Sequence, residues 1–296
     1  MKIIVIGSKD HGSKNDPAVL AESVRVDAVQ STVVYWEDII FHVKTDDVTL
    51  TYQGEDIFAE PVDLIIATGW YKTGYRDVAY ALALVAGAKN VPLWNSEIAN
   101  QRSSTKLSCM VQLALEGVSV PETIFSLTDS SYIADRPLPF IAKASAASRG
   151  QSNYLIETED DRRMMVDRKQ TDFLVQPFMP NDHDLRVICF DGKPQLVLKR
   201  ARAEDSESHL NNTSQGGSAE WLDLSQVSAE LLTISEKICT IMSREMAGID
   251  FIPDASSPYQ YSCLEVNAIP QLTSGVDVEI KMAALKNSIN RLKERT

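Results

Sequence analysis

Two strand-like segments near the C-terminal end of the chain place three oxygen-bearing side chains on an otherwise apolar pattern. The first segment is Gly248-Ile-Asp250, and a turn rich in Pro, Asp and Ser separates it from the second, Leu264-Glu265-Val-Asn267. Side chains alternate along a strand, so Glu265 and Asn267 face the same side, and pairing of the two strands brings Asp250 beside them. The pattern therefore predicts a hairpin with one polar face.

That polar face offers two carboxylates and one amide. Hard cations such as Mg²⁺ prefer oxygen ligands, usually one or two protein carboxylates together with substrate phosphates. The spacing of Asp250, Glu265 and Asn267 suits such a cation, and it suits an exposed polar strand face equally well.

Length and composition bound the remaining interpretations. The chain has 296 residues, enough for one large or two to three small domains, and its 44% hydrophobic and 24% charged content is that of an ordinary globular protein. No apolar run approaches the roughly 18 to 20 residues of a membrane span. The N-terminal residues 1–7 read as a first β-strand and not as a signal peptide.

Charge and cysteine usage indicate the compartment and the kind of partner. The net charge of −12 argues against a nucleic-acid binder, which needs a basic face, but is compatible with a basic peptide or protein substrate. The cysteines form no close pair, so we expect buried free thiols and a cytoplasmic location. These residues are Cys109, Cys189, Cys239 and Cys263.

The first hundred residues predict a small doubly wound α/β domain. Apolar, β-branched strands at 2–6, 32–36 and 63–68 are followed by an Ala- and Leu-rich helix at 75–88, and an inserted hairpin is expected at 41–52.

The remaining residues predict two α+β regions. In 101–178 we expect a helix at 106–116, strands at 139–144 and 172–178, and a helix or its entry loop at 157–163. In 179–296 we expect a hairpin of 185–190 with 194–200 around Asp191-Gly192, a long amphipathic helix at 226–247, and a closing helix at 278–293. The predicted domains are thus 1–100, 101–178 and 179–296.

Gly248-Ile-Asp250, a short hairpin and Leu264-Glu265-Val-Asn267 with Pro270 three residues on resemble the C-terminal signature of the ATP-grasp superfamily. Within it, the chain is most similar to the ribosomal-protein glutamate ligase and glutathione synthetase branch. The resemblance implies the ATP-grasp fold, with two α+β lobes that clamp ATP. It also implies that Asp250, Glu265 and Asn267 bind Mg²⁺ ions bridging the ATP phosphates, with Mn²⁺ as an alternative metal.

The same resemblance implies roles for basic residues at the phosphates. Lys106, before Gly117-Val-Ser-Val-Pro121, and Lys143, which ends an apolar strand, match the two phosphate lysines. Ser148 and Gly150 fall in the phosphate loop, although relatives often have more glycines there. Asp184-Leu-Arg186 matches the motif whose arginine faces the γ-phosphate. Lys199 or Arg200 adds a further cation, because strand alternation lets only one point inward.

Two further segments complete the implied site. Gln176, Pro177, Phe178 and Met179 resemble the hinge that binds adenine, where relatives often carry a glutamate in place of Pro177. Proline has no N–H, so its neighbours must supply the contacts. Asn212 matches the asparagine of the loop that caps the triphosphate, and Gln215 replaces a basic residue of the relatives.

The implied activity is ATP-dependent joining of a carboxylate to an amine through an acyl phosphate, with release of ADP and phosphate. Lys143, Arg186 and Asn212 are the predicted catalytic residues, because phosphoryl transfer relies on positioning and charge neutralisation. The expected amine acceptor is an amino acid, a peptide or a protein tail; no nucleic acid or membrane partner is expected, and a homo-oligomer is left open. Two alternatives are a kinase on the same fold and a non-catalytic ATP-binding protein.

Overall fold

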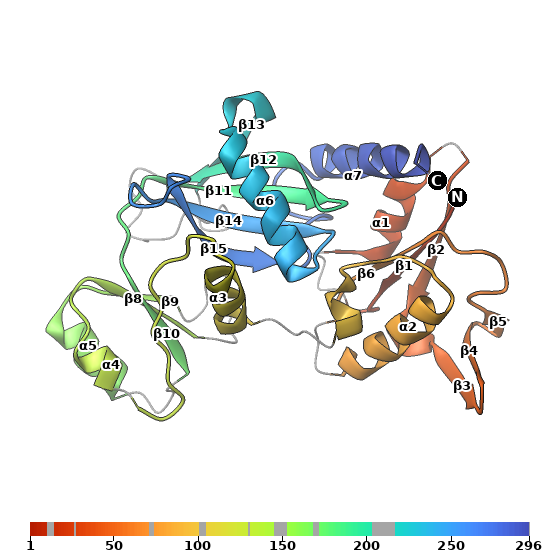
Figure 1. Ribbon diagram of the computed structural model, residues 1–296, viewed down its shortest axis with the longest axis horizontal. Coiled ribbons are helices and arrows are strands. Elements are labelled where there is room, and N and C mark those ends of the chain that lie inside the picture. Colours follow the sequence, from red (N-terminus) through yellow and green to blue (C-terminus); the bar gives the residue numbers. More distant parts are fainter. Residues whose placement is uncertain are drawn as a thin grey trace.

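The computed structural model describes residues 1–10, 15–26, 28–70, 74–100, 105–129, 131–144, 153–167, 172–202 and 217–295. Three main sheets follow one another along the long axis of the molecule (Figure 1). The N-terminal sheet lies at one end, the sheet of β8, β9 and β10 at the other, and the largest sheet lies between them.

The N-terminal sheet is parallel, with strand order β2-β1-β6-β7. Helix α1 packs on one face through Leu20 and Val24, and helix α2 packs on the other through Leu82. The predicted doubly wound arrangement is therefore confirmed. Its elements are β1 (Lys2–Gly7), α1 (Pro17–Val24), β2 (Gln30–Tyr35), η1 (Trp36–Asp38), β6 (Leu64–Ala67), α2 (Arg76–Ala88), β7 (Leu93–Trp94) and η2 (Ser96–Asn100).

The inserted hairpin is also confirmed, and it gains a short third strand. Strand β3 (Ile40–Lys44) pairs antiparallel with β4 (Asp47–Tyr52), which pairs with β5 (Glu55–Asp56). This small sheet projects from the side of the N-terminal sheet (Figure 1).

The second sheet is antiparallel, with order β10-β8-β9, formed by β8 (Phe140–Ala144), β9 (Asn153–Ile156) and β10 (Phe173–Pro177). Its apolar side packs against residues of α4 (Ser131–Ala134) and α5 (Glu159–Val166), through Phe140, Phe173 and Val175 among others. Side chains alternate along a strand, so Ile141, Lys143, Leu174 and Gln176 face away from these helices.

The central sheet is antiparallel with order β13-β12-β11-β14-β15. Helices α3 (Lys106–Leu115) and α6 (Ala229–Met242) pack on one face, and α7 (Val278–Lys293) packs on part of the other. The strands are β11 (His183–Phe190), β12 (Lys193–Ala201), β13 (Ser218–Leu222), β14 (Ala247–Pro253) and β15 (Tyr261–Asn267), and η4 (Leu224–Gln226) follows β13.

The predicted helix at 226–247 is too long and is corrected here. Helix α6 begins after Ser228, whose hydroxyl accepts from the Leu231 N–H, and ends at Met242 because Ser243 adopts a left-handed conformation (φ 53°). Residues 244–246 instead contact Asn95 and Glu97, just after the N-terminal sheet, and Ala247 already belongs to β14. The prediction ran past the helix end because Met246 and Ala247 are also buried, the first at this contact and the second in β14, and so continue the apolar pattern of the helix.

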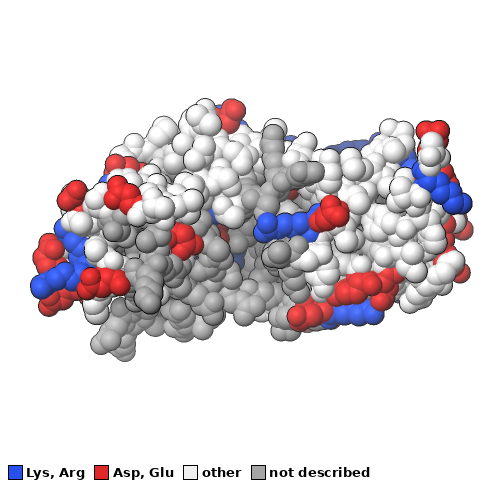
Figure 2. All heavy atoms as spheres, turned by 90° about the horizontal axis from the view of Figure 1, so that it is seen from below, with Lys and Arg blue, Asp and Glu red and all other residues white. Residues whose placement is uncertain are grey.

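Charged side chains of both signs are intermixed on the face shown in Figure 2, and no continuous basic patch forms among the described residues there. This distribution agrees with the net charge of −12. Among the described residues, no helix has the length and apolarity to cross a membrane.

Candidate functional site

The hairpin predicted from the sequence is formed by β14 and β15, and it brings the three oxygen-bearing residues together. Asp250 lies directly opposite Glu265, and Asn267 lies opposite Gly248. A Cβ at position 248 would lie 3.0 Å from the Pro270 Cβ, which is tighter than a usual contact, so a larger residue there would push Pro270 outward. The absence of a side chain at 248 therefore lets Pro270 close over the strand.

Two arginines lie beside Asp250. Arg186 of β11 donates from Nε and Nη2 to the two carboxylate oxygens of Asp250, both at 2.7 Å. Arg200 of β12 donates to Asp184 Oδ1 at 2.6 Å and lies 3.4 Å from Asp250 Oδ1. Burial disfavours the charge on Asp250, but the two guanidinium groups more than offset it and lower the pKa of Asp250. The Asp250 carboxylate is therefore held ionised.

The lysine predicted at the end of the second sheet faces this cluster. The charges of Glu265 and Asp250 act on Lys143, as does that of Lys106 at the start of α3. Burial lowers the pKa of Lys143 to about 8, with Lys106 acting in the same direction and the two carboxylates opposing it. Lys106 Nζ donates to the Ala144 carbonyl at 3.5 Å, so both lysines gather where β8 ends.

The hinge segment leads from β10 towards β11. Gln176 is buried and donates from Nε2 to Thr123 Oγ1 at 2.9 Å, while Pro177 ends the strand. The Phe178 N–H donates to the Pro139 carbonyl at 3.2 Å, and the Met179 carbonyl accepts from the Asn181 amide at 2.9 Å. The Phe178 N–H is thus already engaged within the protein.

The expectation that Lys199 lies in the site is corrected. Lys199 stands opposite Leu185, which belongs to the core under α3 and α6, so its side chain is on the face away from Arg186. The cation that β12 contributes is Arg200, which is 5% exposed. Because side chains alternate along a strand, the sequence left Lys199 and Arg200 as alternatives for the inward-facing cation. Only the register of β12 on β11 decides between them.

Three predicted site residues lie outside the described residues. They are Ser148, Gly150 and Asn212.

Lys281 of α7 is a residue that the sequence analysis did not single out. It is buried, and its ammonium donates to the carbonyls of Gln271 and Ser274 at 2.8 and 2.7 Å. It therefore holds the loop that follows Asn267. An isolated lysine on a helix gives no signal of this in the sequence.

The donor set fits a magnesium ion that shares its coordination with a nucleotide. Within the described residues, no group of three or more His, Cys, Asp or Glu side chains could hold a metal on its own. Asp250, Glu265 and Asn267 supply two carboxylates and an amide, and Mg²⁺ commonly takes its other ligands from phosphates and water. Arg186 uses one lone pair on each Asp250 oxygen. A carboxylate has about four lone pairs, so Asp250 can bond Arg186 and still offer lone pairs to a metal ion.

Comparison with protein families decides the family. Residues 103–289 match the RimK-like ATP-grasp domain. The chain belongs to the RimK-like ATP-grasp family. The match extends from three residues before α3 to the last turns of α7, so it contains the second and central sheets.

Relatives in this family are named as glutamate ligases. The chain is 28% identical over 236 residues to a probable alpha-L-glutamate ligase of Psychromonas ingrahamii, covering 76% of this chain and 73% of the relative. It is 26% identical over 203 residues to the ribosomal protein bS6–L-glutamate ligase of Shigella boydii, covering 64% and 65%. The chain is accordingly a member of a family of C–N bond-forming ligases.

Solved ATP-grasp ligases share the fold over nearly the whole chain. The ligase PsnB, in complex with a minimal precursor, Mg and ADP, superposes with a TM-score of 0.70 at 16% identity, covering 97% of each chain. D-alanyl-alanine synthetase A of Vibrio cholerae superposes with a TM-score of 0.65 at 15% identity, covering 98% of each. The ATP-grasp fold predicted from the sequence is confirmed.

Proposed function

We propose that this protein joins a carboxylate to an amine through an acyl phosphate, with ATP and Mg²⁺ bound between the second and central sheets. The observation that carries the proposal is that Asp250 and Glu265 stand opposite each other on the β14–β15 hairpin, while Lys143 at the end of β8 lies within range of both charges. Cations on one sheet facing carboxylates on another are what a metal–triphosphate complex requires.

Each group has a defined part in the proposed reaction. Asp250, Glu265 and Asn267 would hold Mg²⁺, which would neutralise charge on the phosphate oxygens. Lys106 and Lys143 would bind phosphate as point charges, and Arg186 would stabilise the transferred γ-phosphoryl group. The substrate carboxylate attacks that group, ADP leaves, and the amine then displaces phosphate to form the amide.

The adenine would lie against the face of the second sheet that carries Ile141 and Leu174, which are 7% and 1% exposed. Pro177 has no N–H, the Phe178 N–H donates to Pro139 and the Met179 carbonyl accepts from Asn181, so we propose the Met179 N–H as the hinge donor to the adenine edge.

The names of the relatives support a peptide or protein acceptor. One relative is a ligase of ribosomal protein bS6, and PsnB is solved with a precursor peptide. We therefore propose a glutamate or similar amino acid joined to a peptide or protein partner.

Two measurements test the reaction class. ADP release is screened with amino acids and peptides, and products are identified by mass spectrometry. Hydroxylamine is then added with ATP and the active carboxylate in the absence of the amine. A ligase yields a hydroxamate from the acyl phosphate. A stable phosphorylated product without hydroxamate would assign the protein to the kinase alternative.

A further inference from the structure

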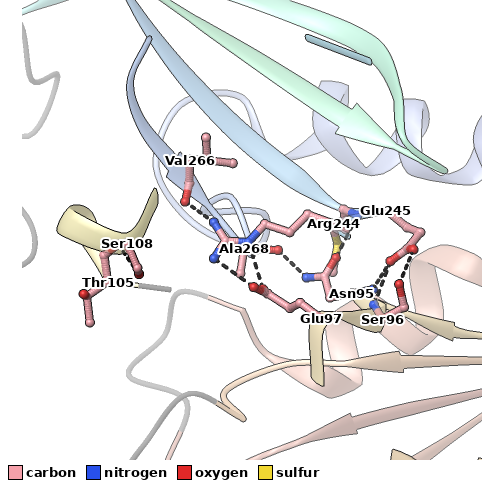
Figure 3. A network of polar contacts seen from close by, with 10 residues as sticks. Asn95, Ser96, Glu97, Thr105, Ser108, Arg244, Glu245, Val266 and Ala268 are labelled. Carbon is pink, nitrogen blue, oxygen red and sulfur yellow. Dashed lines mark hydrogen bonds and ion pairs between the residues drawn. The ribbon is translucent and has the colours of Figure 1, made fainter. Parts of the chain in front are cut away.

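A polar network joins Asn95 and η2, which directly follow the N-terminal sheet, to the residues that precede β14 and to the end of β15 (Figure 3). Arg244 donates to both carboxylate oxygens of Glu97, at 2.8 and 3.1 Å, and their side chains are 3% and 0% exposed. Glu245 accepts from the backbone N–H groups of Asn95 and Ser96, at 2.6 and 2.8 Å, and from the Ser96 hydroxyl at 2.7 Å.

Two members of this network also bind the strand that carries the proposed metal ligands. Arg244 Nη1 donates to the Val266 carbonyl, and Asn95 Nδ2 donates to the Ala268 carbonyl. Asn95 Oδ1 accepts from the Met246 N–H at 2.9 Å, so one amide side chain joins the entry of β14 to the exit of β15. Val266 and Ala268 are the residues on either side of Asn267.

Among the strands that the structure describes, β15 is an edge strand and pairs with β14 alone. An edge strand has backbone groups that no neighbouring strand engages. Here Arg244 and Asn95 engage carbonyls on both sides of Asn267, beside the point where the ladder ends. The Val266 carbonyl belongs to the planar peptide group that leads into Asn267, so Arg244 limits the rotation of that group and with it the orientation of Asn267. The Ala268 carbonyl lies one peptide group beyond Asn267, so Asn95 limits the course of the backbone as it leaves this residue.

We propose that Arg244 and Asn95 are positioning residues that set the metal-binding geometry of β15. This inference rests on the proposed function, since it takes Glu265 and Asn267 as metal ligands. The guanidinium group suits the role because it is planar and rigid. Its two hydrogen bonds to Glu97 therefore fix the direction of Nη1, which donates to the Val266 carbonyl. The segment that follows the N-terminal sheet thereby contributes to the metal site without contacting the metal.

Alternative explanations of the network predict different behaviour. If the network served only to hold the two parts of the protein together, loss of any contact across the interface would have the same effect on metal binding. A buried ion pair is also poor evidence for stability, because apolar residues of similar volume often replace such pairs without loss. The positioning role instead predicts that only contacts to β15 affect the metal.

The test measures Mn²⁺ binding to the full chain with ADP, by electron paramagnetic resonance of free Mn²⁺. Arg244→Lys keeps the charge opposite Glu97 but cannot span Glu97 and Val266 together. Asn95→Gly removes the amide without backbone strain, because Asn95 has a left-handed conformation (φ 67°). Ser96→Ala is the matched control, since it loses a contact to Glu245 at the same interface and none to β15. Thermal melting establishes that each variant is folded.

We expect Arg244→Lys and Asn95→Gly to weaken Mn²⁺ binding by about tenfold or more, the range typical of residues that orient metal ligands. Ser96→Ala should bind Mn²⁺ as the wild type does. If Arg244→Lys does not fold, Asn95→Gly alone decides the question.

Glu265→Gln distinguishes failure of the positioning role from failure of the metal site. Weak Mn²⁺ binding by Glu265→Gln together with unchanged binding by the folded Arg244→Lys or Asn95→Gly would overturn the positioning role and leave the metal site standing. Unchanged binding by Glu265→Gln would overturn the metal site and the proposed function with it.

Discussion

Arg186 and Asp250 form a two-pronged ion pair, with Nε and Nη2 each 2.7 Å from a carboxylate oxygen. The pair joins β11 to β14 at directly opposed positions in the sheet. It places the guanidinium proposed to face the γ-phosphate against a proposed metal ligand, so the orientation of one group depends on the other.

Arg186→Lys is expected to lower kcat while leaving ATP affinity nearly unchanged. A lysine keeps the charge but cannot bond both Asp250 oxygens in the same fixed geometry. Loss of one donor aimed at transition-state charge costs about 10²- to 10³-fold in kcat. ADP release gives kcat, and calorimetry gives the affinity for ATP. Arg163→Lys, in an exposed ion pair with Asp160, is the control. Retention of more than half the wild-type kcat in Arg186→Lys would remove Arg186 from the proposed mechanism.

The lowered pKa of Lys143 predicts that kcat/KM for ATP depends on pH. This pKa is lowered to about 8, so the ammonium is charged below that pH and loses its charge above it. Because the charged form binds phosphate, kcat/KM for ATP should fall as pH rises through about 8. Lys143→Arg stays charged over this range and should move the fall to higher pH. Lys193→Arg, on an exposed pair with Glu236, should keep the wild-type profile. A flat wild-type profile between pH 7 and 9 would contradict the assignment of Lys143 to phosphate.

Lys199 and Arg200 are expected to differ sharply although they are neighbours. Lys199→Ala should change kcat and KM for ATP by less than about twofold, because Lys199 faces away from the site and surface changes are usually small. Arg200→Ala leaves Asp184 buried without its guanidinium partner and should lower the free energy of unfolding by about 3 to 5 kcal/mol. Urea unfolding measures the stability difference. A large activity loss in Lys199→Ala would show that the lysine reaches the nucleotide after all.

Glu265→Gln should reduce ADP release at saturating Mg²⁺ to less than a tenth of the wild-type rate. The amide keeps the size of the side chain but not the negative charge that balances a metal ion. Melting temperature should change little, since Glu265 is only partly buried. Glu220→Gln, on β13 of the same sheet, is the matched control and should retain wild-type turnover.

Local pattern was sufficient for most of the secondary structure and for the β14–β15 hairpin that is proposed to bind metal. The closing helix at 278–293 has the bounds predicted for it, and Asp250, Glu265 and Asn267 align as strand alternation requires. These features depend on side-chain periodicity and on turn residues close in sequence. Short elements that depend on distant partners were missed, among them α1, β7, β9 and β13.

The sequence by itself determined which residue types could bind phosphate and metal, and which strands would carry them. Only the tertiary structure decided that Arg200 and not Lys199 faces Asp250, because that choice depends on the register between β12 and β11. It also decided that Asn95, Glu97 and Arg244 meet, across more than 140 positions of sequence, around the end of β15. Buried polar groups must find partners when the sheets pack together, and that requirement acts between segments that no local pattern connects.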